Sequence, residues 1–353
     1  MDSTYVGKYG DLKAASLRFM SSDKVKELMG KSSDEILSAL SQTDYREDLD
    51  KFVKMYKIPD SVEIAINAHM VGMLRHVYEA IPPLARDFIY AYMSKWDIEN
   101  IKVILSSKFL GYEVGHSEAF LVIQHDLPVS LVSGIISGAD YRTIIEQKGV
   151  EEVVSSLVRF GYGALLLKHI ESFRREGSIS DMLLALDRSY YSDLMSSFRF
   201  YNGDEGAVLE FVRELIDMNN ILSVIKAMSS GYSDMAKDFI IPGGNIRDEI
   251  IYRMLSKPDI ESIKQDLPFE IGWAFDRYKR DRSIGVFEYA IMDSIYSKYL
   301  GIFSASSGAL SFILWFILRC EIERDTLRSI WFNKYYGIDE EKPTGAIMAR
   351  YFR

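Results

Sequence analysis

The chain has 353 residues, 48% hydrophobic and 26% charged, so it can bury a large core and is long enough for two or three domains. Its net charge of −9, with basic residues scattered among acidic ones, argues against a nucleic-acid-binding protein, which needs a concentrated positive face. A single cysteine, Cys320, excludes an internal disulfide bond and a thiolate metal cluster.

Helices are predicted from the start of the chain. The opening residues lack the basic and apolar segments of a secretory signal, so we expect a protein of the cytoplasmic side. Residues 5–20 predict one helix and residues 24–29 a second. The tripeptide Gly-Lys-Ser at 30–32 resembles the end of a phosphate-binding loop, but Val25 stands where that motif needs its earlier glycine. A helix stop with a solvated lysine is therefore the better interpretation.

One helical segment occurs three times along the chain. Each copy begins with a carboxylate and ends with a glycine, and its apolar residues lie on one helical face. The positions that the copies share are Asp97, Asn100 and Gly111 in the first, Asp217, Asn220 and Gly231 in the second, and Glu323, Thr326 and Gly337 in the third. We expect a buried helix in each copy, ended by its glycine in the left-handed conformation.

The similarity extends toward the N-terminal side of each copy. Asn67, Asp187 and Asp293 each lie 30 residues before a carboxylate, with helix breakers in between. The carboxylates recur after 120 and then 106 residues, a period too long for a short-unit solenoid. We therefore expect an all-α chain of three similar domains, each with a partial core. The expected domains are residues 1–124, 125–238 and 239–353.

Two further patterns support repeated units. A hexapeptide ending at Tyr45 is similar to one ending at Tyr162, with a leucine five residues before each tyrosine, and the third unit has no clean equivalent. Turn signals at 127–128 and at 241–244 predict the starts of the second and third units. No run of alternating apolar and polar residues predicts a strand.

Residues 299–318 form an uncharged stretch that is long enough to span a bilayer. Two glycines and four serines interrupt it, and the sequence SASSG in its middle predicts a loop where the repeats place a helix break. We therefore expect two helices here and no membrane span.

Candidate catalytic or metal-binding residues are few. The pair His125-Asp126 is similar to the His-Asp pair of metal-dependent phosphohydrolases, and His69, His76 and His116 lie elsewhere, but the Leu-Pro that follows makes the aspartate a helix cap. No serine nucleophile elbow or His-Glu-x-x-His motif occurs. The three recurrent carboxylates suggest a three-fold ligand site, but a helix start or an interhelical hydrogen bond explains them better. We predict no catalytic, cofactor-binding or metal site.

With its three repeated helical segments, the chain resembles the C subunit of the archaeal-type (A-type) rotary ATP synthases. The counterpart of that subunit in the vacuolar (V-type) enzymes is the d subunit. The resemblance covers essentially the whole chain. The residues that carry it are the three carboxylate-to-glycine helices, Tyr9-Gly10 with Lys13 and Arg18, Leu40 with Thr43 and Tyr45, residues 185–191 and residues 241–244. The third copy departs from the other two at Arg324 and Asp325.

The resemblance implies three helical domains about a pseudo-three-fold axis, in a funnel at the cytoplasmic face of the membrane. It implies a non-catalytic rotor subunit of the central stalk, a socket that transmits torque for ATP synthesis coupled to proton or sodium transport. The implied partners are the central shaft subunits and the proteolipid ring, with no cofactor, no nucleic acid and no direct membrane span. Two alternatives remain: a helical scaffold unrelated to ATPases, and a helical metallohydrolase.

Overall fold

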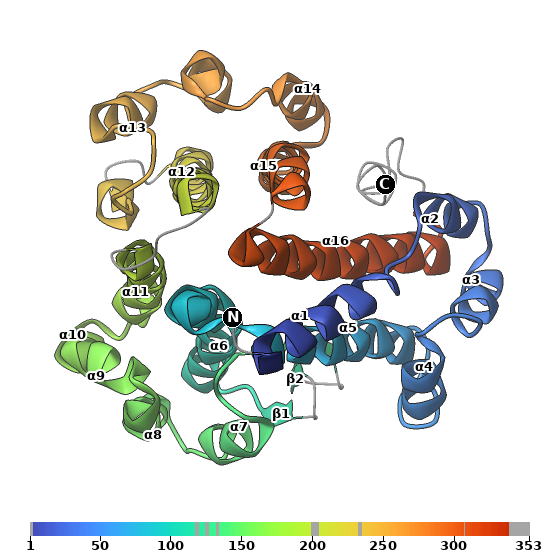
Figure 1. Ribbon diagram of the computed structural model, residues 1–353. Coiled ribbons are helices and arrows are strands. Elements are labelled where there is room, and N and C mark those ends of the chain that lie inside the picture. Colours follow the sequence, from blue (N-terminus) through green and yellow to red (C-terminus); the bar gives the residue numbers. More distant parts are fainter. Residues whose placement is uncertain are drawn as a thin grey trace. The chain divides into compact units, whose positions relative to one another are not determined.

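A computed structural model of the chain describes residues 3–116, 120–123, 127–131, 134–198, 205–231, 235–306 and 308–338. Most of the described residues are helical, which confirms the predicted all-α fold (Figure 1). The chain divides into two compact units, one made of residues 1–190 and 316–353 and the other of residues 191–315. The three sequence-based domains, with boundaries at 124/125 and 238/239, stay a prediction.

The first unit is centred on two long helices, α5 (Asp60–Ala80) and α6 (Arg86–Leu110), and it includes the C-terminal part of α16 (Ala309–Tyr335). Its first helices are α1 (Ser3–Ser16), α2 (Ser22–Met29), α3 (Ser33–Leu40), α4 (Arg46–Phe52), α5 (Asp60–Ala80) and α6 (Arg86–Leu110). After a small sheet follow α7 (Gly138–Ile145), α8 (Val150–Ser156), α9 (Tyr162–Leu166) and α10 (Ile170–Glu176). Helices α11 (Ser180–Ser197) and α16 (Ala309–Tyr335) have residues in both units.

Packing on α5 organises the first unit. Helices α1 and α4 both pack against α5, and strand β3 (Leu127–Leu131) of a small sheet packs against α5 and α6. The α5 face is apolar, with Ile64, Ile66 and Leu74 fully buried. Two consecutive prolines, Pro82 and Pro83, separate α5 from α6, because proline cannot continue a helix from its interior.

The small sheet was not predicted. It contains β1 (Val114–His116), β2 (Phe120–Ile123) and β3 (Leu127–Leu131), paired antiparallel in the order β1-β2-β3. Strand β2 is a continuous apolar run and therefore lacks the alternation that marks a half-buried strand. Leu127 and Pro128 pair with β2, so the turn expected at these residues is wrong, and the next helix begins ten residues later, at Gly138.

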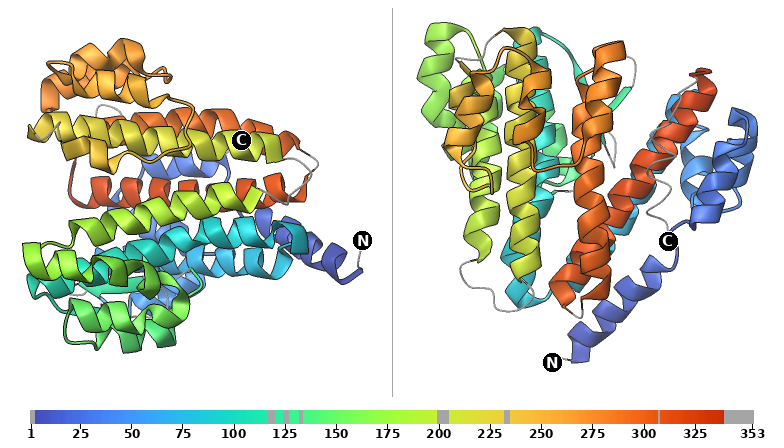
Figure 2. Two further views of the ribbon diagram at one scale, coloured as in Figure 1. Left: turned by 90° about the vertical axis from the view of Figure 1, so that its left-hand side faces the viewer. Right: turned by 90° about the horizontal axis from the view of Figure 1, so that it is seen from above.

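The second unit contains one pair of long helices with shorter helices beside them. Its helices are α12 (Glu205–Ser230), α13 (Asp248–Leu255), α14 (Gly272–Asp281) and α15 (Gly285–Ala305). Helices α12 and α15 run side by side (Figure 2), and the Phe211 ring packs on the rings of Tyr299 and Phe303 at centroid distances of 5.2 and 5.6 Å. These rings form an apolar contact between the two helices.

The uncharged stretch at 299–318 does not form one helix. Helix α15 ends at Ala305 and α16 begins at Ala309, as the SASSG sequence predicts. Over the ranges given above, no helix is long and apolar enough to cross a membrane.

Candidate functional site

The three recurrent carboxylates are buried well inside long helices. Asp97 lies in α6, Asp217 in α12 and Glu323 in α16, with exposed fractions of 0%, 1% and 4%. None lies at the beginning of its helix, so the helix-start explanation is wrong. A buried carboxylate needs hydrogen-bond donors, and all three find them outside their own helix.

Asp97 binds a loop in the first unit. Its carboxylate accepts hydrogen bonds from the backbone N–H groups of Ile135 at 2.7 Å and Ile136 at 3.2 Å, and from the hydroxyl of Tyr141 at 2.8 Å. Burial raises the pKa of Asp97 to about 6, although these hydrogen bonds favour the ionised form. Gly134 lies directly against the carboxylate, since an added Cβ would come within 2.2 Å of it.

Asp217 binds a loop of the second unit in the same way. It accepts from the backbone N–H groups of Asn245 at 3.0 Å and Ile246 at 2.9 Å, and burial raises its pKa. Gly244 occupies the place of Gly134, because a Cβ there would also come within 2.2 Å of a carboxylate oxygen. The close approach of carboxylate and loop therefore requires glycine at both sites.

Glu323 makes a variant of this contact. It accepts from the backbone N–H of Met20 at 2.8 Å and from the hydroxyl of Tyr45 at 2.8 Å. Burial raises the pKa of Glu323, while both hydrogen bonds lower it. Arg18 stands two residues before Met20, at the position that glycine holds in the other two loops. The longer glutamate side chain reaches the loop without that glycine.

The three contacts have equivalent positions in the chain. Met20, Ile136 and Ile246 each donate an N–H to a buried carboxylate, and each lies two residues before a short helix, namely α2, α7 or α13. Each carboxylate therefore joins the middle of a long helix to the beginning of a short one. Tyr45 and Tyr162, which end the two similar hexapeptides, both direct a hydroxyl to a carboxylate, Tyr162 to Asp97 at 3.4 Å.

The other recurrent polar residues are also buried. The Asn220 side chain accepts from the backbone N–H of Ile241 at 2.9 Å and donates to its carbonyl oxygen at 2.8 Å, which fixes the turn before α13. Asn100 and Thr326, at the equivalent positions of α6 and α16, are fully buried. The three terminal glycines have the expected left-handed conformation, with φ of 75° at Gly111, 74° at Gly231 and 63° at Gly337.

Sequence reasoning found the carboxylates and missed the loops that they hold. The loop residues Ile135, Ile136, Asn245 and Ile246 donate to the carboxylates through backbone N–H groups, so their side chains carry no signal. Glycine at 134 and 244 was the available signal, since each glycine precedes the two donor residues.

The sequence candidates for metal and nucleotide binding were the histidines and the Gly-Lys-Ser tripeptide. Among the residues described here, no group of three His, Cys, Asp or Glu side chains could hold a metal ion. His125 and Asp126 lie outside the described residues. At the tripeptide, Gly30 ends α2 and Ser32 forms a capping box with Glu35 at the start of α3, as the helix-stop interpretation predicts.

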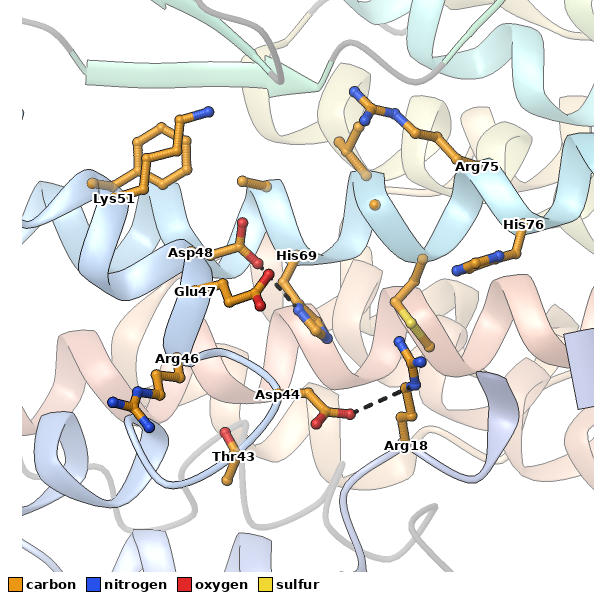
Figure 3. A pocket seen from close by; sticks show the side chains of 15 residues that line it. Arg18, Thr43, Asp44, Arg46, Glu47, Asp48, Lys51, His69, Arg75 and His76 are labelled. Carbon is orange, nitrogen blue, oxygen red and sulfur yellow. Dashed lines mark hydrogen bonds and ion pairs between the residues drawn. The ribbon is translucent and has the colours of Figure 1, made fainter. Parts of the chain in front are cut away.

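A cleft of about 630 Å³ lies over α5 in the first unit (Figure 3). Four basic and three acidic side chains line it, together with His69 and His76: Arg18, Arg46, Lys51, Arg75, Asp44, Glu47 and Asp48. Two of the acids already have partners, since Asp44 lies 4.0 Å from Arg18 and Asp48 lies 3.2 Å from His69. The cleft therefore has no concentrated charge of one sign and is best described as a solvated, mixed-charge groove.

Comparison with known proteins identifies the family. Residues 10–345 match the family model described as ATP synthase (C/AC39) subunit. The chain belongs to this family. It is 38% identical to the C subunit of the A-type ATP synthase of Thermoplasma volcanium and 38% identical to that of Thermoplasma acidophilum, in each case over 97% of both chains. It is 24% identical to the corresponding protein of Methanocaldococcus jannaschii, over 90% of this chain and 80% of the relative.

Membership of the ATP synthase (C/AC39) family confirms the resemblance seen in the sequence. It rules out a helical scaffold unrelated to ATP synthases. The family match also covers all three carboxylate contacts, because they lie between residues 20 and 323. All three contacts therefore lie within the part of the chain that matches the family model.

Proposed function

We propose that this chain is a non-catalytic rotor subunit of an A-type ATP synthase. In the proposed role it is part of the central stalk, links the shaft subunits to the membrane proteolipid ring, and transmits torque for ATP synthesis coupled to proton or sodium transport. The observation that carries the proposal is the family match over residues 10–345, together with relatives that are named as C subunits of A-type ATP synthases.

The carboxylate contacts support a mechanical role. A part that transmits torque must resist deformation, and its stiffness depends on how firmly its helices are joined. Asp97, Asp217 and Glu323 each accept charge-assisted hydrogen bonds in a buried setting, which are about twice as strong as hydrogen bonds between neutral groups. Each bond joins a long helix to a neighbouring loop, so the contacts act as internal braces.

The mode of attachment follows from charge and hydropathy. A net charge of −9 makes attraction to anionic lipid unavailable as the main force, and the described helices include none that could cross a membrane. We therefore propose peripheral attachment at the cytoplasmic face, through protein contacts with the ring and the shaft. The pseudo-three-fold funnel of three domains is part of this proposal.

The test is ATP-driven ion pumping in membranes that lack this chain. We expect pumping to be lost while the soluble head continues to hydrolyse ATP, because the head retains its catalytic sites and loses its mechanical connection. Adding back the purified chain should restore pumping. Undiminished pumping without the chain would refute the socket role.

A further inference from the structure

One surface of the first unit combines exposed apolar side chains with lysines. Of the seventeen large apolar side chains that are exposed among the described residues, six belong to two short segments. The first segment, 51–58, runs from the end of α4 to the residues just before α5, and the second, 334–338, is the end of α16 and the residues that follow. The six side chains are Val53, Met55, Ile58, Tyr335, Tyr336 and Ile338.

The two segments lie side by side because α16 and α5 run antiparallel. Arg328 donates to Glu63 at 2.8 Å, and the Trp331 indole N–H donates to the carbonyl of Pro59 at 3.1 Å. Each turn toward the end of α16 is therefore a turn toward the start of α5. One turn beyond Trp331 comes Tyr335, whose ring lies 5.6 Å from the Trp331 ring, at the level of the loop before α5 (Figure 1). The segments thus form one continuous surface.

The basic residues of this surface are all lysines, and neither segment contains an acid. Among the residues that the structure describes, Lys54, Lys57 and Lys334 are exposed and take part in no ion pair. Lys51 is exposed as well, and its ammonium group lies over the Phe52 ring. We call these four lysines and the six apolar side chains the lysine–tyrosine patch.

Acidic residues flank the patch in the sequence. Asp50 lies 3.8 Å from Arg46, which compensates its charge. Asp60 begins α5 and is half-buried. An acidic tripeptide, residues 339–341, follows Ile338 and lies outside the described residues. Within the described part of the chain, the exposed charge of this surface is therefore positive.

The composition of the patch favours a membrane surface over a protein partner. Protein–protein interfaces are enriched in arginine and depleted of lysine, whereas every base of the patch is a lysine. Lysines next to aromatic and aliphatic side chains are typical of segments that lie on a membrane, where the apolar groups enter the headgroup region and the ammonium groups meet anionic lipid.

The net charge of −9 does not prevent such a local contact. At physiological salt, electrostatic interactions between exposed charges extend over only about 8 Å. The lysines nearest to the lipid therefore dominate the interaction, and distant acidic residues contribute little. Four lysines make a weak site, which can add to attachment by protein contacts but cannot replace it.

We propose that the lysine–tyrosine patch binds the surface of a membrane that contains anionic lipid. The ammonium groups contact the lipid phosphates. The most exposed apolar side chains of the patch, Met55, Tyr336 and Ile338, enter the headgroup region, with exposed fractions of 63%, 59% and 51%. The contact is an auxiliary attachment that goes beyond the proposed rotor role and does not depend on it.

The test is binding of the purified full chain to lipid vesicles, measured by co-sedimentation. One set of vesicles contains phosphatidylcholine alone, and the other contains about 30% phosphatidylglycerol in addition. We expect binding to the anionic vesicles only, and we expect it to weaken as salt is raised from about 0.1 to 0.5 M. Failure of the wild type to bind anionic vesicles at the lower salt concentration would overturn the proposal, whatever the outcome of the pumping experiment.

Two variants separate the charged and the apolar contributions of the patch. Lys54→Gln/Lys57→Gln/Lys334→Gln removes three lysines and should lower the partition to anionic vesicles by about tenfold or more. Met55→Ser/Tyr336→Ser keeps every charge and should lower the partition by about fivefold or more. All five side chains are exposed, so we expect both variants to keep the helical circular-dichroism spectrum of the wild type.

A matched control changes the same number of lysines elsewhere. Lys148, Lys168 and Lys226 are exposed and take part in no ion pair within the described ranges. Lys148→Gln/Lys168→Gln/Lys226→Gln alters the net charge as much as the patch variant does, and we expect its partition to stay within about twofold of the wild type. Equal loss of binding in the two triple variants would show that the net charge governs binding, and would overturn the patch.

The acidic tripeptide gives a test in the opposite direction. Asp339→Asn/Glu340→Gln/Glu341→Gln removes negative charge next to the patch in the sequence, so we expect tighter binding to anionic vesicles. A weaker partition of this variant would contradict attraction between the lysines and the lipid. If the wild type ignores both kinds of vesicle and the patch instead holds an acidic protein, the surface is a protein interface and the lipid proposal is wrong.

Discussion

At the scale of single residues, the fold depends on how a buried charge is compensated. Asp97 has two backbone N–H donors and the Tyr141 hydroxyl within 3.2 Å, yet burial still raises its pKa to about 6. The desolvation of the carboxylate therefore outweighs the donors. Such a group fixes one arrangement of the loop, because any other leaves the charge buried without partners.

This balance predicts a pH dependence of stability. The pKa of Asp97 in the folded chain, about 6, is above the ordinary value of 3.8, so the folded state binds this proton more tightly than the unfolded state. The contribution of Asp97 to the free energy of unfolding is then greatest below about pH 4 and falls as the pH rises to about 6. In Asp97→Asn this titration is absent. We expect the stability advantage of the wild type over the variant to shrink by about 2 kcal/mol between pH 4 and 7 in urea unfolding. An advantage independent of pH would contradict the assignment.

The glycines that face the carboxylates give a second prediction at this scale. A Cβ at Gly134 or Gly244 would lie 2.2 Å from Asp97 or Asp217, so the loop or the helix would have to shift. We expect Gly134→Ala and Gly244→Ala each to lower the free energy of unfolding by about 1–3 kcal/mol. Gly72→Ala in α5 is the control, since its Cβ meets nothing within 4 Å and alanine favours a helix interior. Equal stability of Gly134→Ala and Gly72→Ala would argue against the close contact.

At the scale of elements, the three glycines that end the repeated helices affect stability through backbone conformation, separately from side-chain packing. Gly111, Gly231 and Gly337 have positive φ, and a Cβ at each meets nothing within 4 Å, so the effect of alanine there comes from the left-handed conformation alone. We expect each alanine variant to lose about 1 kcal/mol, measured by chemical denaturation. Gly30→Ala is the matched control, because Gly30 also ends a helix but has a φ of −81° and should tolerate alanine.

The helices and strands also show which parts of the fold could be predicted from the sequence and which could not. The long helices and their ends were predictable, because apolar periodicity and a final glycine are local signals, as at Gly231 of α12. The sheet was not, because the strand Phe120–Ile123 has no alternation and is held by pairing with segments on both sides. The carboxylates at 97, 217 and 323 were found by their recurrence. Their donors were not, because a backbone N–H can belong to any residue and only the three-dimensional structure brings it to the helix.

At the scale of the whole molecule, repetition in sequence and compactness in space divide the chain differently. The third sequence copy, residues 323–337, belongs to the compact unit that contains residues 1–190. Its helix α16 begins in the other unit, which holds residues 191–315. In the sequence, the whole of the second unit lies between residue 190 and the part of α16 that belongs to the first unit. The first unit is therefore complete only when α16 is present.

This arrangement predicts that a chain ending after Trp315 cannot maintain its first unit. The truncation removes several side chains with at most 3% exposure from that unit: Phe316, Ile317, Leu318, Ile322, Leu327, Ile330 and Trp331. At roughly 1.5–3 kcal/mol for each buried side chain, the loss matches or exceeds the roughly 5–15 kcal/mol that stabilises an ordinary domain. We expect amides of α5 and α6 to lose protection from deuterium exchange in the truncated chain, and a peptide of residues 316–338 to restore it when added. Protection of α5 and α6 that survives truncation would show that the first unit folds without α16.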